Sequence, residues 1–346
     1  MATTRSALFG SQPRAGSEPR LDRLHIGCSK LPHRLGFGCA GLMRVASSRA
    51  RQRLLSEAFD HGVRHFDVAR MYGLGAAEAE LGKFARGRRE QLVIATKFGI
   101  ETSATSSRLA RVQTPARALV ARSPALRATL KRRAAVFHRP HRYDPATARA
   151  SLELSLRELG TDYVDILFVH DPSPRDDLQV AELGEALADL ARAGYLRAWG
   201  FAGEPEPCIA LDAAVTAPTV LQIRDDIFAR GLRLDRDRPR VTFGILADAL
   251  GRILIQISHD EGRRARWRNT MGGDRATPED VASLLLQDAL ARNPSGTVLF
   301  STTRPERIAL AARAAEAVSS SHEPVPLRMF RQLVACELPP DLARHG

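Results

Sequence analysis

The sequence predicts a closed (β/α)8 barrel, a TIM barrel, because short apolar runs alternate with amphipathic helical stretches from Leu35 to near the end of the chain. No Pro- or Gly-rich linker interrupts this alternation, so a single barrel domain is expected over residues 31–346. The chain has 346 residues, and barrels of this class often exceed about 250 residues as one domain.

Eight short apolar segments are the expected strands. They cover residues 35–39, 64–67, 92–97, 164–169, 196–201, 219–223, 241–246 and 296–300. Seven amphipathic segments are the expected helices. They cover residues 48–61, 76–85, 145–159, 180–193, 206–214, 278–291 and 305–317. In the third of these, Leu152, Leu156 and Leu159 recur at helical spacing. The helix after Ile223 is poorly defined.

Two segments fall outside the alternation. Residues 1–30 form a basic, acid-poor N-terminal tail that we interpret as poorly ordered, although such a start is also found in transit peptides. An Arg-rich insertion over residues 100–144 follows the third strand. It is either a lid whose charge favours anionic substrates or a solvated surface segment enriched in Arg by coding bias.

The net charge of +12 does not by itself indicate a nucleic-acid-binding protein. Of the 51 cationic residues only four are lysines, which points to coding bias, and residues 101–142 alone carry +9. That segment has few aromatic residues and no nucleic-acid-binding motif, so no nucleic-acid partner is predicted. No apolar run reaches the roughly 18 residues of a membrane span, so no membrane association is predicted either.

The four cysteines lie far apart in the sequence: Cys28, Cys39, Cys208 and Cys336. Without a CxxC pair they favour neither a metal site nor a disulfide framework. This usage is typical of a reducing compartment, and a cytoplasmic protein is expected.

A literal G-x-G-x-x-G stands at residues 36–41, but its context does not fit a dinucleotide-binding fold. Such a fold needs a helix that opens at the glycines, whereas the next helix begins only near Ser47. Asp67, the candidate acidic partner, comes 31 residues after Gly36. We interpret the glycines as positions where the backbone approaches a ligand at a strand end.

Four polar residues occur at or just after the C-terminal ends of the second, third and fourth strands, where barrel enzymes place their chemistry. Asp67 ends the second strand and Tyr72 lies in the loop that follows it. Lys97 ends the third strand and His170 the fourth. A lysine at the end of an apolar strand needs an anionic partner, and Asp67 can be that partner.

Through these residues the chain resembles the aldo-keto reductases over roughly residues 35–317. The matching segments are GFGCAGL, HFDVARMYG, AEAELG, IATKFG, SLELSLRELGTDYVDILFVHDP and, less closely, STTRPERI. The resemblance implies a catalytic tetrad of Asp67, Tyr72, Lys97 and His170.

The chemistry of these groups agrees with that role. Reduction of a carbonyl by hydride places negative charge on the oxygen, so a proton donor must lie beside it. A phenol is a reluctant donor, and we expect the ammonium group of Lys97 to lower the pKa of Tyr72 while Asp67 holds that ammonium. His170 can hydrogen-bond the carbonyl oxygen and orient it.

Hydride needs a cofactor, because no side chain supplies one. The resemblance implies NADP(H), with NAD(H) as the alternative, and no metal. Gly38, Asp67 and Gln222 are expected to contact it, Gln222 at the nicotinamide carboxamide. Its 2′-phosphate is expected after the eighth strand, where hydroxyl and guanidinium groups gather at the start of a helix. These residues are Ser301, Thr302, Arg304 and Arg307. The alternative there is an ordinary capped helix with exposed arginines.

Three positions depart from the family pattern. Ala202 and Gly203 stand where a Ser-Asn pair is usual, so that part of the carboxamide contact is missing or comes from the backbone. No aromatic residue follows the seventh strand, Phe243 being the nearest. The segment ALAARAA lacks an amide side chain near the expected adenine site.

The sequence therefore predicts an oxidoreductase that reduces a small aldehyde, ketone or sugar-like carbonyl, with Tyr72 as the general acid. The alternative is a non-catalytic relative that binds nucleotide or a partner protein. The substrate, the reaction direction and the oligomeric state do not follow from the sequence.

Overall fold

We describe the protein from a computed structural model. It describes residues 34–100, 141–173, 176, 178–217, 219–228, 238–271, 277–318 and 324–338. The N-terminal tail lies outside these residues, and so does the Arg-rich insertion except at its two ends.

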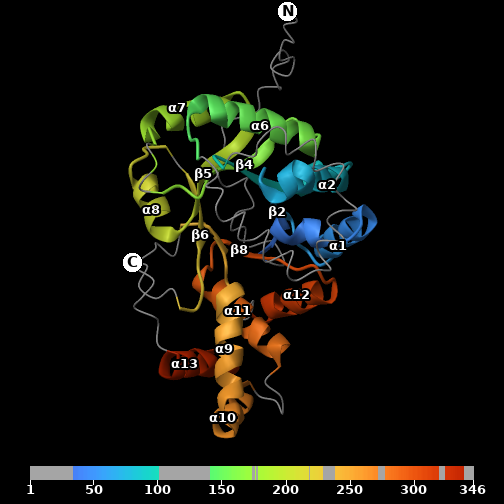
Figure 1. Cartoon of the computed structure of the whole chain (residues 1–346), viewed down its shortest axis with the longest axis vertical. Helices are drawn as coiled ribbons and strands as arrows, with labels where there is room; N and C mark the ends of the chain where they lie inside the picture. Colours follow the sequence, from blue (N-terminus) through green and yellow to red (C-terminus); the bar gives the residue numbers. More distant parts are fainter. Residues whose placement is uncertain are drawn as a thin grey trace, which may run out of the picture.

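Eight parallel strands close into a barrel in sequence order (Figure 1). They are β1 (Leu35–Gly38), β2 (His65–Asp67), β3 (Val93–Phe98), β4 (Val164–His170), β5 (Leu196–Gly203), β6 (Val220–Arg224), β7 (Val241–Phe243) and β8 (Thr297–Phe300). β1 pairs with both β2 and β8, which closes the ring. The predicted fold class is confirmed.

Along each strand, one residue faces the inside of the barrel and the next faces the surrounding helices. Val93 and Ala95 of β3 pack inside with Ile166 and Phe168 of β4 in one apolar cluster. The residues between them, such as Ile94, belong to the larger cluster under the helices. Both faces are buried, so these strands read as continuous apolar runs.

Helices pack around the barrel, and seven of them begin and end within one residue of the predicted bounds. The matching helices are α1 (Ser48–Asp60), α2 (Ala76–Ala85), α6 (Pro145–Leu159), α7 (Val180–Arg192), α8 (Pro205–Ala213), α11 (Pro278–Arg292) and α12 (Glu306–Val318). In the part of the chain that the structure describes, three short 3-10 segments accompany them: η2 (Cys39–Arg44), η3 (Tyr72–Gly75) and η4 (Arg89–Gln91). The described residues between β6 and β7 include no helix.

Local sequence explains the boundaries of α6. The side chain of Asp144 accepts a hydrogen bond from the N–H of Thr147 at 2.8 Å, which caps the start of α6. Gly160 ends the same helix at φ +64°, in the left-handed region that suits glycine.

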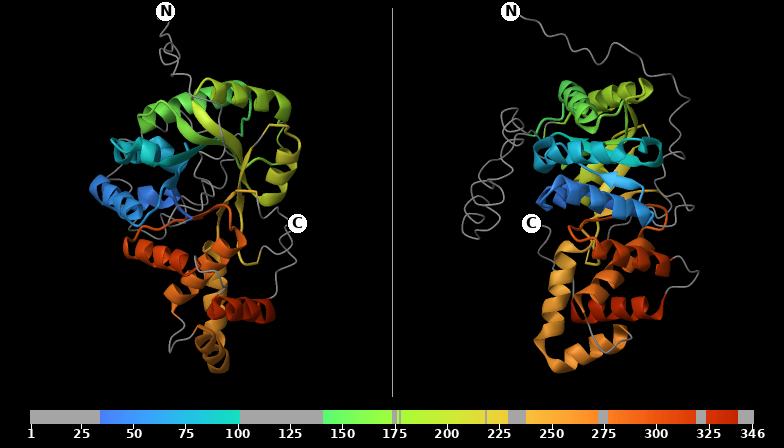
Figure 2. Two further views of the ribbon diagram at one scale, coloured as in Figure 1. Left: turned by 180° about the vertical axis from the view of Figure 1, so that it is seen from behind. Right: turned by 90° about the vertical axis from the view of Figure 1, so that its right-hand side faces the viewer.

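The region around and after β7 differs from the prediction. β7 ends at Phe243, three residues before the expected Leu246, because Gly244 turns the chain at φ +80°. Three helices among the described residues were not predicted: α9 (Ala247–His259), α10 (Glu261–Met271) and α13 (Val325–Glu337). Together with α11 they extend from one side of the barrel (Figure 2).

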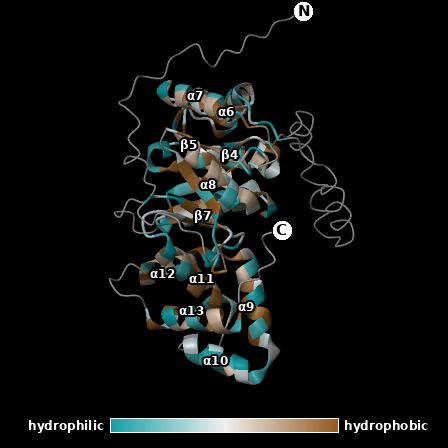
Figure 3. Cartoon of the chain, turned by 90° about the vertical axis from the view of Figure 1, so that its left-hand side faces the viewer, coloured by the Kyte–Doolittle hydropathy of each residue, from teal (hydrophilic) through white to brown (hydrophobic). Residues whose placement is uncertain are grey.

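These helices hold together around their own apolar cluster. Trp267 of α10 is fully buried, and its ring lies 5.8 Å from that of Phe330 on α13. Figure 3 shows α10 as mainly hydrophilic, which explains why its sequence gives no amphipathic signal. One buried tryptophan therefore anchors a helix that periodicity alone does not reveal.

His65 is buried inside the barrel two residues before Asp67. It is 3% exposed, and neither ring nitrogen hydrogen-bonds to a residue that the structure describes. Burial, followed by the charge of Lys97, lowers its pKa from 6.5 to about 3. The folded protein therefore keeps this imidazole neutral while the unfolded chain takes up a proton below pH 6.5.

This difference predicts acid sensitivity. The stability contributed by neutral His65 is complete above pH 6.5 and is lost as the pH falls towards 3. Between pH 7 and pH 5 the free energy of unfolding should fall in both proteins. We expect this fall to be about 2 kcal/mol smaller in His65→Leu than in the parent protein. Urea denaturation at both pH values measures this. An unchanged pH dependence in the variant would show that His65 is not the group responsible.

Candidate active site

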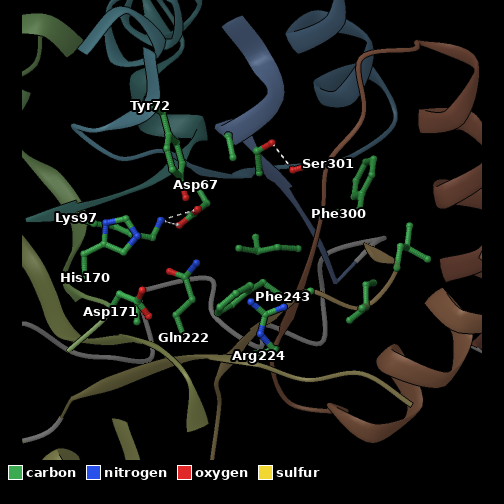
Figure 4. Close-up of a pocket in the computed structure, with 18 of the residues that line it drawn as sticks. Asp67, Tyr72, Lys97, His170, Asp171, Gln222, Arg224, Phe243, Phe300 and Ser301 are labelled. Atoms are coloured by element: carbon green, nitrogen blue, oxygen red, sulfur yellow. Dashed lines mark hydrogen bonds and ion pairs between the residues drawn. The ribbon is translucent and has the colours of Figure 1, made fainter. Parts of the chain in front are cut away.

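A cavity of about 480 Å³ opens at the C-terminal ends of the strands (Figure 4). Asp67, Tyr72, Lys97 and His170 all line it, and they come from β2, the loop after it, β3 and β4. The strand residues follow the inward alternation, so Lys97 continues the line of Val93 and Ala95. The structure thus brings together the four side chains that the sequence singled out.

Lys97 and Asp67 form a buried ion pair. Lys97 Nζ lies 2.6 Å from both carboxylate oxygens of Asp67 and 3.1 Å from the carbonyl oxygen of Val68. Both side chains are less than 5% exposed. Burial is the largest single effect and lowers the pKa of Lys97, but the charge and hydrogen bond of Asp67 together with the charges of Tyr72 and Cys39 outweigh it, so the pKa is raised. Lys97 is therefore a fixed positive charge at neutral pH.

Asp67 is held by more than the lysine. Burial is the largest effect and raises the pKa of its carboxyl, while the charge and hydrogen bond of Lys97 and a hydrogen bond from the side chain of Gln222 partly oppose that rise. The amide nitrogen of Gln222 is the donor in that bond. The pair is thus fixed from β2, β3 and β6 at once.

A tight loop places Tyr72. Gly73, Leu74 and Gly75 have φ values of +60°, +58° and +87°, all in the left-handed region. Such a run is unfavourable for Leu74 and has to be held by its surroundings. Arg70 provides this support, because its guanidinium lies over Gly75 and pairs with buried Glu78 at 2.8 Å.

Glu78 connects this loop to the lysine strand. Its other carboxylate oxygen accepts a hydrogen bond from Thr96 Oγ1 at 2.8 Å, and Thr96 directly precedes Lys97. Glu78 and Thr96 are both fully buried. The loop that carries Tyr72 and the strand that carries Lys97 are therefore joined through one carboxylate.

The ionisation of Tyr72 differs from the expectation. Lys97 Nζ lies 5.5 Å from the centre of the Tyr72 ring and does lower the pKa of the phenol. Burial has the larger effect, however, and the pKa is raised above its ordinary value. The expectation of a lowered pKa is wrong for this structure. The hydroxyl is protonated at neutral pH, which is the form that can donate a proton.

His170 faces Tyr72 across the cavity. The two ring centres lie 6.3 Å apart with the planes nearly perpendicular, at 85°. Burial, then the charges of Lys97 and His141, lowers the pKa of His170 to about 3. The imidazole is neutral at neutral pH, so it can donate one hydrogen bond without carrying charge.

Three of the expected cofactor residues other than Asp67 line the same cavity: Gly38, Gln222 and Ser301. Ser301 Oγ donates a hydrogen bond to the carbonyl oxygen of Gly38 at 2.6 Å, which joins the ends of β8 and β1. A Cβ atom on Gly38 would lie 2.5 Å from that hydroxyl oxygen. Gly36 differs from the expectation, because side chains of β8 and not a ligand would meet its Cβ.

The other expected phosphate residues lie beyond the cavity wall, at the start of α12. Thr302 Oγ1 accepts a hydrogen bond from the N–H of Arg304 at 3.0 Å. This hydrogen bond lies within the turn before α12, so the N–H is already used there. The side chains of Arg304 and Arg307 are exposed. Their guanidinium groups remain the candidates for an anion at this position.

The sequence did not reveal several cavity residues. Asp171, Glu204 and Arg224 line the cavity, and Arg224 Nε donates a hydrogen bond to Glu204 at 2.7 Å. The signal was present, since the inward alternation of β5 and β6 continues to residues 204 and 224. Phe243 also lines the cavity, with the Arg224 guanidinium 5.4 Å from its ring centre. An aromatic side chain is therefore present at this wall after all.

Among the residues that the structure describes, no three His, Cys, Asp or Glu side chains are grouped so as to hold a metal ion. The described helices also include none that is long and apolar enough to cross a bilayer.

The model of the aldo/keto reductase family matches residues 34–230, and the chain belongs to this family. An aldo-keto reductase of Schizosaccharomyces pombe, yakc, whose name includes NADP(+), is 28% identical over 62% of this chain and 54% of its own length. A D-threo-aldose 1-dehydrogenase of a Pseudomonas species is 31% identical over 48% of each chain. The chain thus aligns with about half the length of these curated relatives.

Solved structures support the fold over more of the chain. The holo form of an aldo-keto reductase from Bacillus halodurans covers 92% of this chain and 98% of its own, with a TM-score of 0.62 and 21% identity. An aldo-keto reductase from Klebsiella pneumoniae in complex with NADPH covers 89% and 92%, with a TM-score of 0.60 and 21% identity. These structures thus support the barrel fold over most of the chain.

Proposed function

We propose that the protein is an NADP(H)-dependent oxidoreductase that reduces an aldehyde, ketone or sugar-like carbonyl. The observation that carries this proposal is the placement of Tyr72, Lys97, Asp67 and His170 around one cavity at the C-terminal ends of the strands. A protonated phenol, a fixed cation and a neutral imidazole meet there, as addition of hydride to a carbonyl requires.

Each residue has a definite part in this reaction. The hydroxyl of Tyr72 gives its proton to the carbonyl oxygen as negative charge develops there. Lys97 stabilises the phenolate that remains, and Asp67 holds the ammonium group in place. Neutral His170 donates a hydrogen bond to the same oxygen and so orients the carbonyl. The reverse direction uses the phenolate as base.

One feature of the cavity supports a nicotinamide cofactor. Gln222 is 3% exposed, and its side-chain oxygen is buried without a hydrogen-bond partner among the described residues. Because its amide nitrogen is bound to Asp67, this oxygen is left to accept a hydrogen bond from a ligand. Gln222 and Gly38 are the residues that would hold the nicotinamide half, and the bound cofactor would supply hydride.

The curated relatives support the carbonyl class more than any single substrate. Their names include a D-threo-aldose 1-dehydrogenase, a 6-dehydroglucose reductase and a pyridoxal 4-dehydrogenase. Polar groups of Asp171, Glu204 and Arg224 on the cavity wall suit a substrate with hydroxyl groups. We therefore place hydroxylated aldehydes and sugar-like carbonyls first among the substrates to be tested.

The deciding experiment is a titration of the purified protein with NADPH and with NADH, followed by addition of a carbonyl panel while nicotinamide absorbance is monitored. Saturable binding and carbonyl-dependent oxidation are expected. Binding without turnover across the panel would favour the non-catalytic alternative. The observation that favours this alternative is that Ala202 and Gly203 have no side-chain donor for the carboxamide. Binding of neither nucleotide would refute the proposed function.

The exposed guanidinium group of Arg304 predicts cofactor preference. If it pairs with the 2′-phosphate, Arg304→Ala should raise the Kd for NADPH about tenfold and leave the Kd for NADH within twofold, since only NADPH carries that group. Fluorescence titration measures both constants. Arg328→Ala, on α13, is the control for loss of one surface charge. Equal weakening of both nucleotides by Arg304→Ala would contradict the assignment.

We further infer a reducing compartment such as the cytoplasm. The cysteines that the structure describes, Cys39, Cys208 and Cys336, are free thiols. The proposed partner is the small-molecule substrate, and neither nucleic acid nor a membrane has a part in the proposal.

A further inference from the structure

The two ends of the Arg-rich insertion meet at the mouth of the barrel. Ile100 and His141 form an isolated antiparallel bridge, and the N–H of Arg142 donates to the carbonyl oxygen of Gly99 at 2.9 Å. The base of the insertion is therefore fixed directly after β3, the strand that ends next to Lys97. The next residue, Tyr143, points away from solvent and is 7% exposed.

Tyr143 reaches the backbone of the catalytic histidine. Its hydroxyl lies 2.8 Å from the carbonyl oxygen of His170 and 3.1 Å from that of Asp171, so its one proton is shared between these two acceptors at the end of β4. Burial raises the pKa of Tyr143, so the hydroxyl keeps its proton. Its ring belongs to the large apolar cluster outside the strands.

The backbone that Tyr143 contacts is in an unusual conformation. Asp171 has φ +55°, a left-handed conformation that a residue other than glycine adopts only when its surroundings hold it. One constraint is the hydrogen bond from the N–H of Asp171 to the carbonyl oxygen of Ala202, at 2.6 Å. The hydroxyl of Tyr143 is the second constraint. Ala202 belongs to β5, on one side of β4, whereas Tyr143 approaches from the other side of β4, next to β3.

Gly99 is matched to the tyrosine ring. It has φ +112°, and a Cβ atom there would lie only 2.1 Å from Cε1 of Tyr143. A glycine is thus required both by the backbone conformation and by the position of the ring. The insertion base, the ring and the turn after β4 fit together as one packed unit.

We propose that Tyr143 is a positioning residue, which ties the base of the insertion to the turn after β4 and thereby fixes the direction in which His170 points into the cavity. The inference deepens the proposed function and rests on it. His170 has to lie within hydrogen-bond reach of the carbonyl oxygen, and a displacement of about 1 Å can cost up to about a hundredfold in rate. Tyr143 itself touches neither substrate nor cofactor in this assignment.

Tyr143→Phe tests the proposal, since it keeps the ring against Gly99 and removes only the hydroxyl. We expect kcat to fall about tenfold, with KM and the Kd for NADPH within twofold. Tyr163→Phe is the matched control, because Tyr163 lies at the opposite end of the same strand, where its hydroxyl contacts Glu90 and Arg197. Tyr163→Phe should leave kcat unchanged even if it lowers Tm as much as Tyr143→Phe does.

Hydrogen–deuterium exchange gives a readout that needs no turnover. In Tyr143→Phe the amide of Asp171 should exchange at least about fivefold faster, while the peptides of β2 keep their rates. Gly99→Ala should displace the ring and give the same two effects, and the double variant should be no worse than either single one. If Gly99→Ala does not fold, Tyr143→Phe alone still decides.

The outcomes separate the two proposals. If the parent protein reduces no carbonyl, the proposed function fails, and the exchange rates alone then decide whether Tyr143 holds the turn. If the parent is active but Tyr143→Phe matches Tyr163→Phe in both kcat and exchange, the positioning role of Tyr143 is wrong.

Discussion

Tyr72→Phe is expected to abolish carbonyl reduction while the protein still folds and binds NADPH. The substitution removes the only proton that Tyr72 can give and keeps the ring beside Lys97 and His170. General acid catalysis by a positioned group contributes about 10²–10⁴-fold, so kcat should fall by at least about a hundredfold. Steady-state kinetics with the best substrate of the panel measures the loss.

Two controls make this result specific. The Kd for NADPH should stay within about twofold, because the phenol hydroxyl is assigned no part in holding the nucleotide. Tyr163→Phe should keep the activity of the parent, since its hydroxyl lies at the other end of the barrel. Retention of more than about a tenth of the parent kcat in Tyr72→Phe would mean that another group donates the proton.

Lys97→Met is the second substitution with a large expected effect, and it acts on both stability and turnover. It leaves the Asp67 carboxylate, which is 3% exposed, without its cationic partner. Removal of one partner of a buried ion pair costs about 3–5 kcal/mol, and the free energy of unfolding should fall by that amount. Turnover should fall by about a hundredfold or more, because the phenolate of Tyr72 loses its stabilising charge.

The double variant Asp67→Asn, Lys97→Met separates these two effects. It removes both charges, so much of the lost stability should return. The turnover should not return, because no cation remains beside Tyr72. Recovery of turnover together with stability would show that Lys97 serves the fold alone.

Much of the barrel could be predicted because its strands are buried on both faces. The runs around Ile94 and Leu167 are continuously apolar, and such short runs indicate buried strands of a parallel sheet. The helices that pack on each other beyond the barrel could not be predicted in this way. α10 places mainly charged residues outward and depends on Trp267, so its burial comes from tertiary contacts that no local pattern contains.

The candidate site shows the same division. Asp67, Lys97 and His170 could be found because strand ends meet at one rim of a barrel. Glu204 and Arg224 follow from the same alternation, yet they were missed because both lie beyond the expected strand ends. The raised pKa of Tyr72 could not be derived, since the balance between burial and the charge of Lys97 depends on three-dimensional distances.

The most direct test of the central claim uses NADPH that carries deuterium at the transferable position of its nicotinamide ring. Mass spectrometry of the product then shows whether deuterium has reached the carbonyl carbon. We predict transfer to at least one hydroxylated aldehyde by the parent protein, and transfer at least about a hundredfold slower in Tyr72→Phe. Saturable NADPH binding with no deuterium in any product, or equal transfer by the parent and the variant, would contradict the account.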